Sequence, residues 1–167
     1  MTSRASRRHP RFGPGPSAGP VPRSVDLPAL IRAAIVAHAR AEDPNEACGL
    51  IVGDRPAADG GRALRWVPTS NLAASPFRYE IDPEALLRLT IETEAADEVF
   101  WAIVHSHTHT PAVPSPTDLR LAFYPDALYV LVSLDPAEAD PATGAESLRA
   151  WRILDGVTHE VEVRPGA

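Results

Sequence analysis

Two histidines spaced two residues apart, followed by an aspartate, are the residues of this sequence best suited to bind a metal ion. His105 and His107 come directly after the apolar run "EVFWAIV", which predicts a strand. Side chains at positions i and i+2 of a strand point to the same side, so both imidazoles can approach one ion. A catalytic zinc site needs three protein ligands and an open position for water. Asp118, in the first turn of a predicted helix, can supply the third ligand.

The segment "SPTD" that contains Asp118 also has a purely structural interpretation. It matches a capping box, with Ser115 as the N-cap, Pro116 at the first helical position and Asp118 at the third. A capping box accounts for Ser115 and Asp118, but not for two histidines at the end of an apolar strand, where polar side chains need partners. The two interpretations are compatible, because a capped helix would hold the Asp118 carboxylate rigidly beside the histidines.

His109 is an alternative third ligand. On one face of a longer strand, His105, His107 and His109 would form a three-histidine zinc site. However, Pro111 and Pro114 follow closely, and "THTPAVPSP" predicts a loop in which the strand periodicity ends. We therefore expect His109 to lie in a loop near the mouth of the site.

Glu46 is the candidate general base. It opens the stretch "EACGLIVG", which predicts a mostly buried strand, where a carboxylate needs a partner or a function. A hydrolytic metal site requires a group that takes a proton from the attacking water, although a solvated strand end is the other interpretation of Glu46. Cys48 is predicted to be a small buried apolar residue, because no CxxC or Cys/His pattern surrounds it.

The remaining elements alternate between helices and strands. Residues 26–44 predict a helix whose stripe on one side consists of Leu27, Leu30, Ile31, Ala34, Ile35 and the half-buried His38. A second helix is expected from Asp82 to about Asp97. Strands are expected at "ALRWVPTSN" (63–71), "FRYEI" (77–81) and "ALYVLVSL" (127–134).

The C-terminal strands predict the fold class. "SLRAWRIL" and "VTHEVEV" alternate apolar and polar residues around Asp155-Gly156, a strong signal for a β-hairpin. Because these strands pair locally, the pattern favours an α+β fold, a mixed sheet flanked by helices, over a doubly wound parallel fold. The phosphate-binding motifs GxGxxG and GxxxxGK[ST] are absent, so nucleotide binding has no support.

Composition narrows the class of protein further. The chain has 167 residues, 44% hydrophobic and 23% charged, which predicts one soluble domain with a real core. A net charge of −6 argues against nucleic acid as a partner, and no apolar run reaches the roughly 20 residues that span a bilayer. A single cysteine fits a reducing cytoplasm, where we expect this protein.

Residues 1–24 differ from the rest of the chain. They are rich in proline and arginine and contain no acidic residue. Such a segment buries too little apolar surface to offset its ordering entropy, and it lacks the apolar run of a secretory signal. The sequence predicts a disordered tail at 1–24 and a single domain at 25–164.

The site residues together resemble the motif of the JAMM (also called MPN+) metalloprotease family. Glu46 is followed by His105-x-His107-x(7)-Ser115-x-x-Asp118, and "PNEACGLIVG" resembles the family strand P-x-E-x-C-G-L-x-x-G. The similarity extends over about residues 25–163. It implies a JAMM/MPN-type fold, a cytidine-deaminase-like sandwich.

The resemblance also implies a role for each matching residue. His105, His107 and Asp118 would bind Zn²⁺, with water as the fourth ligand. Glu46 would be the general acid/base that deprotonates this water. Ser115 would donate a hydrogen bond that stabilises the developing oxyanion.

One departure from the family pattern points to a branch. Many members have proline after the second histidine, where this chain has Thr108. "VHSHT" and "YPDALYVLVSL" resemble the sulfur-carrier-protein–cysteine peptidases of actinobacteria. The implied substrate is a ubiquitin-like sulfur carrier protein ending in Gly-Gly, from which cysteine is released for cysteine biosynthesis. A deubiquitinase-like isopeptidase and a non-catalytic MPN scaffold are the alternatives, and the oligomeric state stays open between a monomer and a homodimer.

The carrier tail is expected to add beside a strand edge. Stretches 64–71 and 77–81 are candidate groove strands. Asn71 and Ser75 are candidate polar contacts for the tail.

Overall fold

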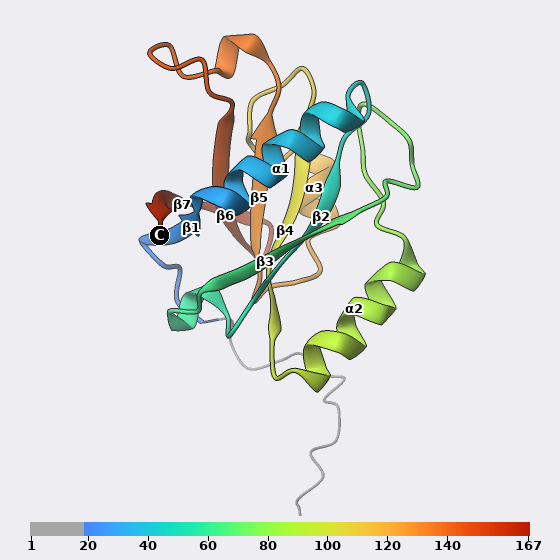
Figure 1. Cartoon of the computed structure of the whole chain (residues 1–167), viewed down its shortest axis with the longest axis vertical. Helices are drawn as coiled ribbons and strands as arrows, with labels where there is room; N and C mark the ends of the chain where they lie inside the picture. Colours follow the sequence, from blue (N-terminus) through green and yellow to red (C-terminus); the bar gives the residue numbers. More distant parts are fainter. Residues whose placement is uncertain (1–18) are drawn as a thin grey trace, which may run out of the picture.

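A single mixed sheet forms the centre of the molecule, in a computed structural model that describes residues 19–167 (Figure 1). The strand order is β1-β7-β6-β5-β4-β2-β3. The strands are β1 (Ser24–Pro28), β2 (Cys48–Gly53), β3 (Ala63–Thr69), β4 (Val99–His107), β5 (Leu128–Ser133), β6 (Ser147–Leu154) and β7 (Val157–Gly166). The helices are α1 (Ala29–Glu42), α2 (Pro83–Ala95) and α3 (Pro116–Arg120), with short 3-10 turns η1 (Ala57–Asp59) and η2 (Pro136–Glu138).

Both strand orientations occur in the sheet. β1 pairs with β7 and β4 with β5 in parallel, whereas the remaining neighbours are antiparallel. Helices α2 and α3 flank β4 in the sequence, and α3 provides the crossover from β4 to its parallel neighbour β5. The predicted α+β fold with a mixed sheet flanked by helices is confirmed.

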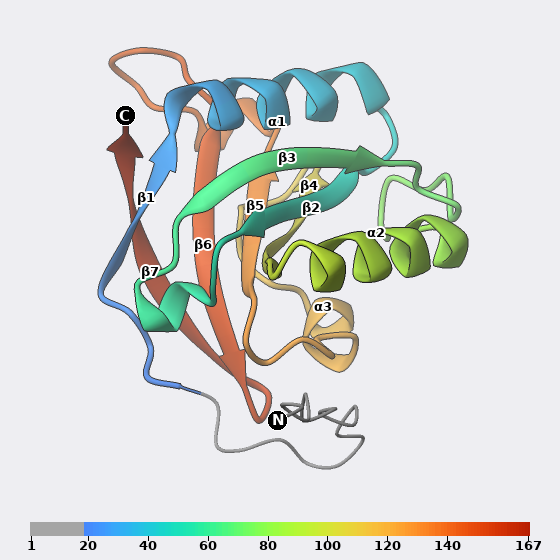
Figure 2. The ribbon, with the colours of Figure 1, turned by 60° about the horizontal axis from the view of Figure 1, so that its bottom comes forward.

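The two faces of the sheet carry separate apolar clusters. Ile31, Ile35 and Ala39 of α1 pack on one face, against residues such as Ile51 and Val130. Leu86 and Leu89 of α2 and Leu119 of α3 pack on the other face with Leu50, Ile103 and Leu131. In Figure 2, α1 lies above β3, and α2 and α3 lie below it. Adjacent residues Leu50 and Ile51 point to opposite faces, as the pleat requires.

The N-terminal part of the domain differs from the sequence prediction. Leu27, predicted on the stripe of the first helix, lies in β1, and α1 begins only at Ala29 after the N-cap Pro28. In β1, Val25 and Leu27 are buried in alternation, and β7 supplies the pairing partner. That partner is more than 100 residues away in the chain, so local periodicity could not indicate the strand. Leu30 is 86% exposed, so it is not part of the buried stripe.

The strand predicted at 77–81 is wrong. The segment 70–82 is a loop, with one isolated antiparallel bridge between Asn71 and Ile81. Within the loop, hydrogen bonds between the Asn71 side chain and the backbone take the place of the backbone–backbone bonds of a strand pair. One of them is the bond from the Glu80 amide to Asn71 Oδ1 at 2.9 Å. Phe77 is 83% exposed, so its aromatic ring does not contribute to a strand face.

The predicted β-hairpin at Asp155-Gly156 and the predicted second helix are both present. Asp155 and Gly156 have φ values of 50° and 75°, as a tight hairpin between β6 and β7 requires. Asp82 caps α2, which ends at Ala95 rather than near Asp97. Among the described residues, none of the helices is long and apolar enough to cross a bilayer.

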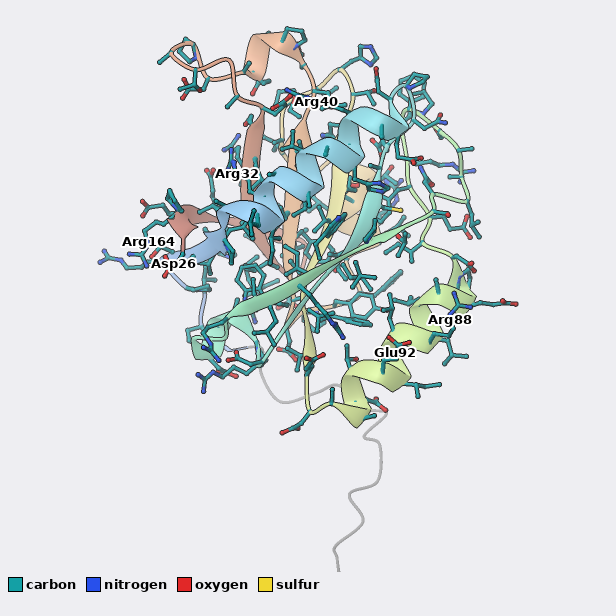
Figure 3. The ribbon with its side chains drawn as sticks, viewed as in Figure 1. Asp26, Arg32, Arg40, Arg88, Glu92 and Arg164 are labelled. Atoms are coloured by element: carbon teal, nitrogen blue, oxygen red, sulfur yellow. The ribbon has the colours of Figure 1, made fainter. Side chains whose placement is uncertain are left out.

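Residues 1–18 of the predicted tail lie outside the described residues. From Gly19 on, the chain contacts the domain, because Arg152 Nη2 donates to the Gly19 carbonyl at 3.2 Å. Arg164 of β7 and Asp26 of β1 form an ion pair at 3.1 Å at this edge of the sheet (Figure 3). The division into a tail at 1–24 and a domain at 25–164 stays a prediction.

Candidate metal centre

Three elements bring the predicted ligands together. His105 and His107 are the buried C-terminal part of β4, and Asp118 is the buried acid in the first turn of α3. The crossover 108–115 returns the chain from the end of β4 to the start of α3, on the sheet face that α2 and α3 cover. His107 and Asp118 are eleven residues apart in the chain, and the crossover brings their side chains into direct contact.

The distances between the ligand atoms fit a tetrahedral metal ion. His105 Nε2 lies 3.2 Å from His107 Nε2 and 3.2 Å from Asp118 Oδ1, and His107 Nε2 lies 3.4 Å from Asp118 Oδ2. Ligands bound at about 2.0–2.1 Å in tetrahedral geometry are themselves about 3.3 Å apart. Two nitrogens and a carboxylate are also the donor set that suits zinc. The residues present therefore fit a zinc ion.

The outer nitrogen of His107 supports the same assignment. Its Nδ1 is 2.8 Å from the carbonyl oxygen of Pro111, a bond in which only the nitrogen can donate. A proton on Nδ1 leaves a lone pair on Nε2 of the neutral ring, and this lone pair faces the Asp118 carboxylate. A cation or a proton is needed between these two electron-rich groups. Such an outer bond is typical of histidines that bind metals.

The capping box at the start of α3 is present as predicted. Ser115 Oγ accepts from the Asp118 amide at 3.1 Å, and the Ser115 amide donates to Asp118 Oδ2 at 2.7 Å. Burial raises the pKa of Asp118, but hydrogen bonds with His105 and His107 outweigh it and hold this pKa well below its usual range. The carboxylate is thus ionised and fixed in direction. The same box leaves the hydroxyl proton of half-buried Ser115 free to donate.

The two histidines have opposite electrostatic surroundings. Burial lowers the pKa of His105. Burial also acts to lower the pKa of His107, but the hydrogen bonds to Asp118 and Pro111 raise it above its ordinary value.

Glu46 lies immediately before β2, next to the end of β4. Its neighbour Ala47 donates to Ser106 Oγ at 2.8 Å and accepts from the Ser106 amide at 3.0 Å, and Cys48 pairs with His105. Glu46 is only 5% exposed. Burial raises its pKa to about 7, with opposing effects from the charges of His107 and Asp118. A carboxylate with this pKa can both take up and release a proton near neutral pH.

Two other candidates lie outside the ligand cluster. His109 is exposed in the loop after β4, where its Nδ1 lies 2.8 Å from Thr108 Oγ1. Among the described residues, the cluster of metal-binding groups contains His105, His107 and Asp118 without His109. Cys48 is buried, and burial raises the pKa of its thiol to about 11, so the thiol is neutral.

Sequence reasoning missed the residues that support the ligands. Tyr79 stacks on His105 with ring centroids 4.4 Å apart, and the Pro111 carbonyl orients His107. Asn71, expected as a polar contact for substrate, uses its side chain for hydrogen bonds to the backbone of its own loop and to the carbonyl of Glu46. An asparagine after a strand is typical of any turn, so the position of Asn71 in the sequence does not indicate which residues it supports.

Comparison with protein families gives one match that covers most of the chain. The family described as prokaryotic homologs of the JAB domain (Prok-JAB) matches residues 28–154. This range includes the three candidate ligand residues, Glu46 and Ser115.

Individual relatives agree with this match. A CysO-cysteine peptidase of Mycobacterium tuberculosis is 44% identical over 131 residues, which are 78% of this chain and 83% of the relative. A desampylase of Haloferax volcanii is 34% identical over 116 residues, 66% of this chain and 81% of the relative. A solution structure of a Desulfitobacterium hafniense protein has a TM-score of 0.70 and 32% identity, covering 85% of this chain and 92% of that protein.

Proposed function

Because the chain belongs to the Prok-JAB family, we propose that it is a zinc-dependent peptidase of ubiquitin-like sulfur carrier proteins. It hydrolyses the amide after the C-terminal glycine of the carrier and releases cysteine. The observation that carries this proposal is the convergence of His105, His107 and Asp118 at tetrahedral ligand distances beside the buried Glu46. The 44% identical CysO-cysteine peptidase supports the substrate class.

His105 Nε2, His107 Nε2 and a carboxylate oxygen of Asp118 would hold the zinc ion. Zinc, when bound, lowers the pKa of a coordinated water and polarises the scissile carbonyl as a Lewis acid. The capping box and the Pro111 carbonyl keep two of the three ligands in the binding orientation. Such pre-orientation reduces the ordering cost of metal binding.

Glu46 is the proposed proton carrier. Its carboxylate takes a proton from the attacking water, and the protonated acid then gives the proton to the departing amine of cysteine. Water adds its oxygen to the glycine carbonyl carbon, the C–N bond breaks, and the products are a carrier carboxylate and free cysteine. A pKa raised to about 7 by burial suits both steps.

Ser115 is the proposed oxyanion donor. Its Oγ already accepts the Asp118 amide, so the hydroxyl proton is directed away from the helix. This proton can donate to the carbonyl oxygen that becomes negative during attack.

The edge strand β3 is the proposed docking edge for the carrier tail. β3 is the last strand in the sheet order and pairs with β2 on one side. A groove beside it is lined by Val67 and Thr69 of β3 and by residues of α2 that include Arg88 and Glu92, which are labelled in Figure 3. An extended tail pairing with β3 would run towards Thr69, which contacts Cys48 at the end of the site strand β2.

The deciding experiment is incubation of the protein with Gly-Gly carrier–cysteine adducts, read by intact mass. We expect loss of the mass of one cysteine residue, complete inhibition by a chelator and recovery with added zinc. Metal analysis should give one zinc per chain. Absence of cleavage by fully zinc-loaded protein would contradict the proposal.

A second candidate function is an isopeptidase that removes a ubiquitin-like modifier from lysine. The similarity to the Haloferax volcanii desampylase favours it. Carrier–cysteine and carrier–lysine adducts of the same carrier, compared at equal concentration, separate the two functions by their ratio of kcat/KM.

A non-catalytic scaffold is disfavoured by the intact ligand set. An empty metal site after purification without chelators would restore that alternative.

A further inference from the structure

The loop 70–82 contacts two members of the metal centre without containing a ligand. We propose that Asn71 is a positioning residue that holds Glu46 in place, and that the loop organised by Asn71 holds His105 through Tyr79. The inference rests on the proposed function, because the position of Glu46 matters to a rate only if Glu46 acts in catalysis.

The side chain of Asn71 uses its entire hydrogen-bonding capacity. Nδ2 donates to the carbonyl oxygens of Glu46 at 2.9 Å and Arg78 at 3.0 Å. Oδ1 accepts from the amides of Ala73 at 3.0 Å and Glu80 at 2.9 Å. Asparagine has two N–H donors and one oxygen with two lone pairs, so all four bonds are satisfied. The loop is folded around this one carboxamide, and no group of it remains for a substrate.

The main chain of Glu46 is held by the same loop at both of its polar atoms. The Glu46 amide donates to the Ser75 carbonyl at 2.8 Å, and the Glu46 carbonyl accepts from Asn71. Glu46 lies two residues before β2 begins, so the sheet does not pair it. These two bonds therefore replace a strand ladder, and they fix the backbone from which the buried carboxylate projects.

Tyr79 transmits the order of the loop to His105. The two rings are stacked, with centroids 4.4 Å apart and an angle of 23° between their planes. Within the part of the chain that the structure describes, His105 Nδ1 is buried without a hydrogen-bond partner, unlike Nδ1 of His107. Besides the contact of Nε2 with Asp118, the stack on Tyr79 thus helps to set the ring plane of His105. Asn71 binds the residues on both sides of Tyr79, namely Arg78 and Glu80.

A second loop offers a matched control. Asp140 organises the loop after β5 in the same way, since its Oδ1 accepts from the amides of Ala142 at 2.8 Å and Thr143 at 2.9 Å. These bonds stay inside that loop and reach none of the site residues. An Asp140→Ala variant therefore loses a loop-organising side chain without touching Glu46 or His105.

The kinetic test compares Asn71→Ala, Asn71→Asp and Asp140→Ala on the carrier–cysteine adduct. Asn71→Asp keeps the acceptor oxygen but places a second oxygen against the carbonyls of Glu46 and Arg78. Because a displacement of about 1 Å can cost about 10²-fold in rate, we expect kcat to fall about 10- to 100-fold in both Asn71 variants. KM should change less than about twofold, as should kcat in Asp140→Ala. Unchanged kcat in both Asn71 variants would overturn the proposal.

Amide hydrogen exchange tests the same inference without activity. In Asn71→Ala, which removes both the Nδ2 donors and the Oδ1 acceptor, the Glu46 and Glu80 amides should exchange at least about tenfold faster, while amides of β5 keep their protection. Equal protection at Glu46 in wild type and variant would contradict the positioning role. Loss of β5 protection in both Asn71 variants would also overturn it, because the residue would then be needed for the fold as a whole.

The absorption spectrum of the cobalt-substituted protein tests the Tyr79 contact. Tyr79→Leu should shift the visible bands, because the ring of His105 turns, whereas Tyr79→Phe keeps the stack and the wild-type spectrum. Identical spectra for all three proteins would remove Tyr79 from the proposal. If wild-type protein cleaves none of the adducts, the proposed function fails, and exchange and spectrum still decide whether Asn71 and Tyr79 position these residues.

Discussion

The two faces of the sheet are built from the same strands, but one face forms the main apolar core and the other carries the candidate metal centre. The face under α1 carries buried apolar residues from all seven strands, and α1 covers it with Ile31, Ile35 and Ala39. The face under α2 and α3 carries a smaller apolar cluster, and its open end holds the buried side chains of His105, His107 and Asp118. Burying polar groups costs free energy unless they are paired. Apolar burial under α1 therefore has to offset the cost of burying the polar site residues on the other face.

Two adjacent residues of β2 lie on the two different faces of the sheet. Ile51 and Leu50 are both fully buried, Ile51 in the α1 cluster and Leu50 in the cluster that includes Tyr79. Burial alone therefore does not distinguish a structural residue from one that supports the site. The face of the sheet on which a side chain lies distinguishes the two kinds of residue.

Glu46→Gln should have the largest effect, a loss of catalytic rate without loss of the metal. General acid/base groups contribute about 10²- to 10⁴-fold, so kcat on the carrier–cysteine adduct should fall about 10³-fold. Zinc content should remain that of the wild type, because Glu46 is not a proposed ligand. Glu94→Gln on the exposed side of α2 is the control with unchanged activity. A Glu46→Gln protein that keeps full activity would remove the proposed mechanism.

Truncation of the two neighbours in β2 compares the faces directly. Ile51→Ala and Leu50→Ala should each lower the free energy of unfolding by about 2–5 kcal/mol, measured by urea denaturation. Only Leu50→Ala should also weaken zinc binding and kcat, by about tenfold, because Leu50 belongs to the apolar cluster against which Tyr79 packs. If both variants lose activity equally, the proposal that only the face under α2 and α3 supports the metal centre is wrong.

Ser115→Ala should affect both stability and rate. Loss of the N-cap of α3 costs about 1 kcal/mol, and loss of an oxyanion donor costs about 10²-fold in kcat. Asp135→Ala removes the N-cap of the 3-10 turn η2, which contains no site residue, and should cost some stability without the loss of rate. Ser115→Thr should retain most of the stability and most of the rate. Equal rates in Ser115→Ala and Asp135→Ala would leave Ser115 with a capping role alone.

The smallest effect is a pH dependence of stability in the metal-free protein. Burial raises the pKa of Glu46 from 4.5 to about 7. Folding therefore favours the protonated acid, and its contribution, complete below pH 4.5, is lost as pH rises through 7. Glutamine is neutral throughout, so Glu46→Gln should be more stable than wild type by about 1–2 kcal/mol at pH 8. The difference should be much smaller at pH 5, and a constant difference would contradict the buried state of Glu46.

Local sequence signals predicted most of the fold and the candidate ligands. Strand periodicity placed His105 and His107 on one side, and the capping box placed Asp118 in the first turn of α3. The hairpin at Asp155-Gly156 followed from turn chemistry alone. These predictions succeeded because each depends on residues within about one turn or two strand positions of each other.

Elements that depend on distant partners were missed or wrong. β1 exists because β7 offers a parallel edge, whereas the sequence prediction placed Asp26, Leu27 and Pro28 at the start of a helix and Ser24 in the tail. The aromatic pattern at 77–81 predicted a strand, whereas Tyr79 turns inward to stack on His105 and Phe77 remains exposed. A period-2 pattern records where side chains are suited to point, but not whether a neighbouring strand is available.

By itself, the sequence determined which groups are present for chemistry: two histidines on one side of a strand, a capped aspartate and a glutamate at a strand entrance. Their types and spacings are local properties, and they depend only on backbone geometry. The tertiary structure alone decided how these groups are held, through the Pro111 carbonyl on His107, Tyr79 on His105 and Asn71 on Glu46. Two of these contacts join residues about 25 apart in the chain, and they arise only when the loop 70–82 folds back over the end of β4.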